Sequence, residues 1–185
     1  MEIIHADQVA PTAWKNGGGT TRVLLTLPAH GDWHLRISMA DVQQDGPFSA
    51  YPGVERWLSF VEGAGMALDF DSGTQTLTPA DSPLRFDGAT PPHGRLLQGP
   101  VRDLNLMNKG GRAAMHRALP GAPWRAELQS CGLFTLQAGH WSCADGRQAA
   151  LPRHALLWFN DAPAAAMTFD QPGLWLAFSA PAAHL

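Results

Sequence analysis

The sequence predicts an all-β fold, a sandwich or barrel built from short strands. Apolar runs of about five to eight residues recur roughly every ten residues, and hardly any segment shows a convincing helical period. The composition agrees, because 15 Pro, 19 Gly and a charged fraction of only 16% suit strands joined by tight turns better than a helical bundle. A chain of 185 residues can bury about 70% of its unfolded surface, which is enough for a substantial core.

The clearest single strand is predicted at residues 32–40. Leu35, Ile37 and Met39 alternate there with polar residues, including Arg36 and Ser38, and this period of two is typical of a half-buried strand. The polar, glycine-containing segment 108–112 is the expected seam between two halves. Taken in order, strands are expected at residues 22–27, 32–40, 56–62, 66–70, 75–78, 84–86, 101–107, 113–117, 124–129, 133–138, 154–159, 165–169 and 174–179.

Charge and motif content argue against several functional classes. The net charge of -3 and the pI near 6.2 disfavour a nucleic-acid partner or an anionic membrane. Eight dispersed His without a His-x-His pair, and only two Cys, disfavour a metal site, and no GxxxxGK[ST] or GxSxG motif occurs. Residues 1–7 do not resemble a signal peptide, and no run is apolar enough to span a bilayer. We therefore expect a soluble cytoplasmic protein.

Four polar clusters, at residues 14–22, 36–41, 45–56 and 98–107, stand out in this apolar chain. Each contains or adjoins a turn or a strand face, and cations exceed carboxylates among them. Interior Arg, Lys, Asp and Asn are costly unless they pair with one another or with a ligand, so the clusters favour an anionic ligand. The alternative is that these side chains face water. For residues 14–22 alone, a ligand-binding loop and a plain glycine-rich turn stay equally open.

Several sequence motifs in and near these clusters resemble those of the HutD/Ves family of cupin-like proteins. They are WKNGGGTTR at 14–22, RISMADV at 36–42, DGPFSAYPGVER at 45–56, LSFVEGAG at 58–65 and DLNLM at 103–107. The chain departs from the family pattern at Val23, where the family often has an acidic residue, and at Glu55, where the family often has Asp. The resemblance implies a bicupin, with two cupin-like β-barrel or jelly-roll lobes in one chain. Residues 1–110 would form the lobe with the polar pocket, and residues 111–185 a mainly structural lobe, with some exchange of strands.

The resemblance also implies a regulator in bacterial histidine utilisation that senses a small acid such as urocanate or formylglutamate. Where a cupin usually carries its metal-binding histidines, this chain has Phe48, Ser49, Tyr51 and Pro52, so we expect neither a metal nor another cofactor. The alternatives are an isomerase or hydrolase acting on such an acid, and a protein-interaction regulator without a ligand. A homodimer and a pathway protein are further candidate partners. The expected ligand-binding residues are Lys15, Asn16, Thr20, Arg22, Arg36, Ser38, Asp41, Arg56, Gln98, Asp103 and Asn105.

Overall fold

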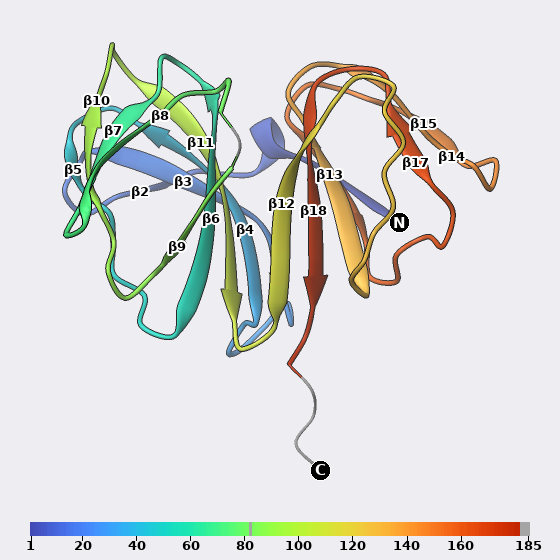
Figure 1. Cartoon of the computed structure of the whole chain (residues 1–185), viewed down its shortest axis with the longest axis horizontal. Coiled ribbons are helices and arrows are strands. Elements are labelled where there is room, and N and C mark those ends of the chain that lie inside the picture. Colours follow the sequence, from blue (N-terminus) through green and yellow to red (C-terminus); the bar gives the residue numbers. More distant parts are fainter. Residues whose placement is uncertain (82, 182–185) are drawn as a thin grey trace. The chain divides into compact units, whose positions relative to one another are not determined.

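The computed structural model describes residues 1–81 and 83–181, and almost every regular element in them is a β-strand (Figure 1). The chain divides into two compact units. One comprises Val9–Gly110, and the other comprises Met1–Gln8 together with Gly111–Leu185. Residues 1–8, which the sequence assigns to the first lobe, thus lie with the C-terminal unit. None of the described helices is long and apolar enough to cross a membrane.

The unit Val9–Gly110 contains two antiparallel sheets. A six-stranded sheet has the order β2-β3-β4-β11-β6-β9, and a four-stranded sheet has the order β5-β10-β7-β8. The strands are β2 (Thr12–Ala13), β3 (Gly19–Leu27), β4 (Leu35–Val42), β5 (Gly46–Pro47), β6 (Val54–Glu62), β7 (Met66–Phe70), β8 (Gly73–Leu77), β9 (Leu84–Asp87), β10 (His93–Leu96) and β11 (Val101–Lys109).

The core of this unit lies between its two sheets. Leu58 and Phe60 of the six-stranded sheet pack in one buried cluster with Met66 and Leu68 of the four-stranded sheet. Because side chains alternate along a strand, this contact identifies which residues of the six-stranded sheet face inward. Those positions decide where the polar side chains of the candidate site point.

The other unit also contains two antiparallel sheets. One has the order β1-β16-β13-β18-β12 and the other β15-β14-β17. A buried cluster that includes Leu133, Trp141, Phe169 and Trp175 draws residues from both. The elements are β1 (Glu2–His5), the 3₁₀ helix η1 (Ala6–Gln8), β12 (Arg112–Ala118), β13 (Ser130–Thr135), β14 (Gly139–Cys143), β15 (Gln148–Leu151), β16 (Ala155–Phe159), β17 (Met167–Phe169) and β18 (Gly173–Ser179).

The structure differs from the strand prediction in several places. Residues 124–129 do not form a strand, and only Trp124 makes an isolated bridge, to Met167. The strand expected at 133–138 lies three residues earlier, at Ser130–Thr135. The short strands β1, β2, β5, β10, β14 and β15 were not predicted. Among them, β14 was missed although its residues alternate between exposed and buried positions.

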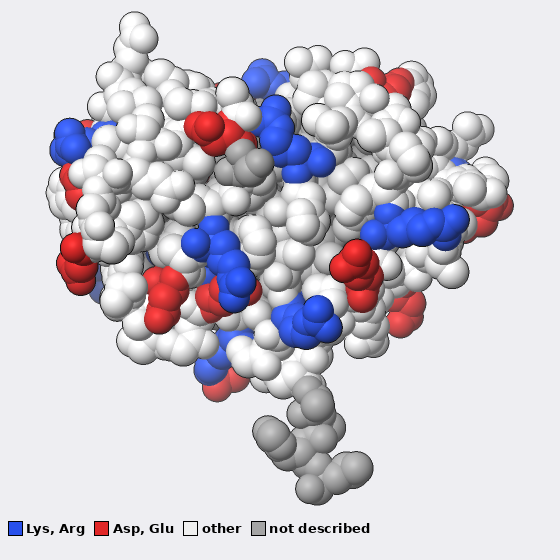
Figure 2. Space-filling view, viewed as in Figure 1, with Lys and Arg blue, Asp and Glu red and all other residues white. Residues whose placement is uncertain are grey.

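The charged surface is mixed in sign on the face that Figure 2 shows. Lys and Arg side chains are interspersed there with Asp and Glu. Charges arranged in this way produce no large field of one sign over that face. Local contacts between individual residues therefore determine the electrostatics of a site.

Candidate functional site

Polar side chains from three neighbouring strands occupy the core-facing side of the six-stranded sheet. Asn105 of β11 lies opposite Ser38 of β4 and Leu58 of β6. Met107 lies opposite Arg36 on one side and Arg56 on the other. Directly paired residues project from the same face of an antiparallel sheet. The structure therefore brings together five of the residues expected from the sequence, namely Arg36, Ser38, Arg56, Asp103 and Asn105.

A chain of side-chain hydrogen bonds runs from β6 to β11 on this inner face. Arg56 Nη2 donates to Asn105 Oδ1 over 2.7 Å, and Asn105 Nδ2 donates to Asp103 Oδ1 over 2.5 Å. The two contacts fix the orientation of the Asn105 amide, since its oxygen must accept and its nitrogen must donate. Arg56 Nη1 also donates to the carbonyl oxygen of Ser49, over 3.2 Å. The guanidinium thereby joins the sheet to the loop that precedes β6.

Three aromatic rings surround the Arg56 guanidinium. The distances from its central carbon to the ring centroids are 5.4 Å for Phe48, 5.8 Å for Tyr51 and 5.0 Å for Phe86. Aromatic faces attract a cation at such distances, and more strongly when water is excluded. Arg56 is only 5% exposed, and its buried Nε has no hydrogen-bond partner among the residues that the structure describes. The three rings therefore surround a desolvated cation whose Nε–H donor is unused.

These aromatic residues were not among the expected site residues. Phe48 and Tyr51 fall in the turn-rich cluster 45–56, and Tyr51 is the single Tyr of the chain. Three rings around one arginine depend on the pairing of β6 with β9, which brings Phe86 opposite Arg56. An apolar residue 30 positions from Arg56 carries no sequence signal for that contact.

Burial dominates the electrostatics of this inner face. Burial raises the pKa of Asp103 to about 7, although the charge of Arg56 and the hydrogen bond from Asn105 act in the opposite direction. Burial also lowers the pKa of Arg56, and the like charge of Arg36 adds to that effect. Arg56 therefore interacts electrostatically with both Asp103 and Arg36. A negative charge placed between the two arginines would be stabilised by both.

Thr20, Arg22 and Asp41 belong to a different group, on the opposite face of the same sheet. Arg22 Nη1 forms an ion pair with Asp41 Oδ2, and Arg102 Nε donates to Asp41 Oδ1 over 2.6 Å. Thr20 Oγ1 lies 3.4 Å from Asp41 Oδ2, and Arg102 also approaches Glu62 at 3.8 Å. Burial raises the pKa of Asp41, but hydrogen bonds from Arg102 and Arg22 outweigh burial and hold this pKa below its ordinary value. This group is balanced in charge and ties β3, β4, β11 and β6 together.

We expect Asp41→Ala to lower the free energy of unfolding by about 1 to 2 kcal/mol, because it leaves two partly buried arginines without their shared acceptor. Asp32→Ala is the matched control. Its carboxylate is 95% exposed and lies 3.5 Å from Lys109 Nζ, so its removal should cost less than about 0.5 kcal/mol. Urea unfolding of the two variants measures both values, and equal losses would contradict a structural role for Asp41.

Lys15, Asn16 and Gln98 lie in exposed turns. Asn16 Oδ1 accepts a hydrogen bond from the backbone nitrogen of Gly18, which stabilises the glycine-rich turn itself. Gly19 is required by packing, since a Cβ there would lie 2.3 Å from the carbonyl oxygen of Asp41. Among the described residues, no hydrogen bond or ion pair joins Lys15, Asn16 or Gln98 to the inner-face group. The opening loop thus has a local structural explanation.

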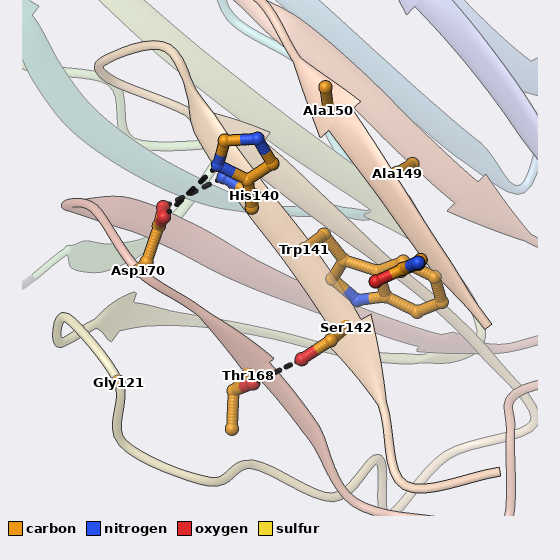
Figure 3. A pocket seen from close by; sticks show the side chains of 9 residues that line it. Gly121, His140, Trp141, Ser142, Ala149, Ala150, Thr168 and Asp170 are labelled. Atoms are coloured by element: carbon orange, nitrogen blue, oxygen red, sulfur yellow. Dashed lines mark hydrogen bonds and ion pairs between the residues drawn. The ribbon is translucent and has the colours of Figure 1, made fainter. Parts of the chain in front are cut away.

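A cavity of about 550 Å³ opens on the C-terminal unit. Figure 3 shows His140 and Ser142 on one strand, with Asp170 and Thr168 beside them. His140 Nδ1 lies 3.3 Å from Asp170 Oδ2, and the hydroxyl oxygens of Ser142 and Thr168 are 2.8 Å apart. None of the expected site residues lines this cavity, whose lining is Gly121, His140, Trp141, Ser142, Gln148, Ala149, Ala150, Thr168 and Asp170. The alternation of polar His140 and Ser142 with apolar Trp141 and Cys143 was the available sequence signal.

Metal-binding groups are not assembled in the described part of the chain. Within residues 1–81 and 83–181, no three or more His, Cys, Asp or Glu side chains lie close enough to hold one ion. Cys131 and Cys143 are both buried with free thiols, in the core of the C-terminal unit.

Comparison with known proteins agrees with the all-β architecture. The structure of HutD from Pseudomonas fluorescens SBW25 is similar with a TM-score of 0.85 at 24% identity, covering 97% of this chain and 98% of that one. A cupin 2 conserved barrel domain protein from Leptotrichia buccalis is similar with a TM-score of 0.58 at 10% identity, covering 96% of each chain. The fold of this chain is thus an all-β cupin fold.

Sequence comparisons identify the family. Protein Ves of Citrobacter koseri is 29% identical over 148 residues, which cover 78% of this chain and 77% of that protein. An uncharacterized 21.2 kDa protein in the hutC 3′ region of Pseudomonas putida is 32% identical over 110 residues, or 58% of this chain and 57% of that protein. A family model described as HutD matches residues 6–177. The chain therefore belongs to the HutD family, as the motifs in its N-terminal half indicated.

Proposed function

We propose that the unit Val9–Gly110 binds a small carboxylate between Arg36 and Arg56, without a metal ion. The observation that carries this proposal is a pair of arginines with unused donors on one core-facing surface. No hydrogen bond or ion pair joins half-buried Arg36 to another described residue, and the buried Nε of Arg56 has no partner. Like charges repel in a poorly solvated site, and a carboxylate accepts the planar fork of a guanidinium in a bidentate manner.

We further propose that the ligand is an acid of histidine catabolism, of the urocanate or formylglutamate type, and that the chain is a cytoplasmic bicupin that restrains this pathway. Membership of the HutD family and the hutC-region relative support that assignment. The rings of Phe48, Tyr51 and Phe86 add planar apolar surface close to Arg56, against which a small unsaturated acid can pack.

Calorimetric titration with urocanate, formylglutamate and glutamate tests the proposal. We expect at least one of these acids to bind, and Arg36→Met to weaken its binding about 10- to 100-fold, since hydrogen bonds to a charged donor are lost. Arg95→Met is the matched control, because Arg95 is exposed on the four-stranded sheet, where it pairs with Asp69. Affinity should not change in that variant.

The absence of both heat and a thermal shift with all three acids would contradict carboxylate binding. Conversion of a bound acid into a product, followed by NMR of the mixture, would instead favour the enzyme alternative. Lys15→Ala and Asp103→Asn would then show which side chain takes part in turnover.

A further inference from the structure

Asp103 is a buried carboxyl group that forms no direct ion pair within the described part of the chain. The residue is 1% exposed, and Asn105 Nδ2 donates to its Oδ1. No Lys, Arg or His of the described residues lies within ion-pair distance of it. The positive charge of Arg56 reaches Asp103 only through space and through the Asn105 amide that bridges them. A buried carboxylate in this position is weakly compensated and sensitive to any added charge.

The groups around Asp103 come from every neighbouring element. Its direct neighbours across the sheet are apolar, Ala40 on β4 and Phe60 on β6. The charged and titratable groups that face this region are Arg36 of β4, Arg56 of β6 and Tyr51 of the loop before β6, with Asp41 on the far side of β4. The charge of Arg56 lowers the pKa of Asp103, and the charge of Asp41 raises it. Arg56 is therefore the main group that keeps Asp103 ionisable.

We propose that binding of a carboxylate at Arg36 and Arg56 is coupled to the uptake of one proton by Asp103, so that the site takes an anion and a proton together. This inference rests on the proposed function. The ligand neutralises the guanidinium charge that Asp103 otherwise feels, and it adds a second negative charge in a water-poor environment. The proton comes from solvent and adds to a carboxyl oxygen of Asp103, while no bond in the ligand changes.

The coupling makes affinity depend on pH in one direction. Below about pH 7 Asp103 already carries its proton, so the affinity for the anion is constant. Above this value every binding event must bring in a proton, and the dissociation constant rises by up to about tenfold per pH unit. A protein with this site responds jointly to the concentration of the acid and to the acidity of its surroundings.

Calorimetry with N-formylglutamate tests the coupling on the unmodified protein. This probe is suitable because it has no group that titrates near neutrality. We expect the dissociation constant to stay constant from about pH 6 to about pH 7 and to rise from there to about pH 8.5. The measured heat should differ between phosphate and Tris buffers, corresponding to uptake of about one proton at the alkaline end. Binding with a flat pH profile and buffer-independent heat would overturn the coupling and leave the proposed function intact.

Two variants sharpen the test. Asp103→Asn keeps an oxygen that accepts from Asn105 but cannot titrate, so it should bind the probe with equal affinity at all these pH values. Asp69→Asn is the matched control, since this exposed carboxylate of the same unit pairs with Arg95, and it should retain the wild-type profile. A wild-type pH slope in Asp103→Asn would overturn the inference. If the unmodified protein binds N-formylglutamate at none of these pH values, both the inference and the binding of this acid are overturned. The comparison of buffers uses the unmodified protein alone, so it does not depend on whether a variant folds.

Discussion

Replacement of Arg56 by methionine is expected to lower the free energy of unfolding by about 3 kcal/mol or more and to abolish carboxylate binding. Methionine keeps apolar contact with Phe48, Tyr51 and Phe86, so the loss reflects charge and hydrogen bonds rather than volume. The variant leaves Asn105 Oδ1 without its donor and Asp103 without its compensating charge. Removal of one member of a buried charged group leaves the others uncompensated, which is strongly destabilising. Urea unfolding at about pH 8, where Asp103 is ionised, measures the effect.

Two further variants separate charge from hydrogen-bond geometry at this position. Arg56→Lys keeps the positive charge but not the fork that reaches both Asn105 and Ser49, so it should recover only part of the stability. In the double variant Arg56→Met with Asp103→Asn, the uncompensated carboxylate is gone. We expect the double variant to be about 1 to 3 kcal/mol more stable than the sum of the single effects. Strict additivity would show that Arg56 and Asp103 do not interact.

Most of the fold could be predicted because side-chain alternation reports directly on strands with one buried face. The strand expected at 32–40 corresponds to β4, and the one at 101–107 to β11. The exception at 124–129 is informative. Trp124, Ala126 and Leu128 are half-buried, and Trp124 stacks on Trp175 with centroids 4.8 Å apart. Period two therefore reports extended backbone with one-sided burial, and it does not establish that a partner strand is present.

The N-terminal strand β1 is the opposite case, a strand that forms although its sequence shows no alternation. Its four residues pair with β16, so Glu2 lies opposite Trp158, more than 150 positions further along the chain. Two adjacent isoleucines within four residues provide no clear period. The partner of such a short segment is fixed by tertiary contacts, which the local sequence does not encode.

The candidate site could be predicted in residue type but not in its division between two faces. Arg22 and Arg36 appear equivalent in sequence, yet they project from opposite sides of the same sheet. Their faces depend on the register of β3 against β4, which contains an irregularity between Val23 and Leu25. A shift of one residue moves every side chain of a strand to the other face. The polar residues on the core-facing side of the sheet can therefore be identified only once the register of the strands is known.

The stability of the protein is expected to fall as the pH rises from about 4 to about 7 through the contribution of Asp103. The pKa of this group is near 3.8 in the unfolded chain and is raised to about 7 by burial in the folded one. Between these values the folded protein keeps a proton that the unfolded chain loses, so the free energy of unfolding decreases with pH by about 1.4 kcal/mol per pH unit at most. Asp103→Asn removes this contribution to the pH dependence of stability, because an amide does not titrate.

The measurable quantity is the difference in stability between Asp103→Asn and the wild type, from urea unfolding at several pH values. This difference should shift in favour of the variant between about pH 4 and about pH 7, and then level off. Asp69→Asn is the control of opposite sign. Hydrogen bonds from Arg95 and Thr74 hold the pKa of Asp69 below its ordinary value, so its contribution is present above about pH 4 and is lost as the pH falls. A difference for Asp103→Asn that does not change between about pH 4 and about pH 7 would mean that Asp103 is ionised in the folded protein throughout this range. The inner face would then hold a permanent negative charge beside its two arginines.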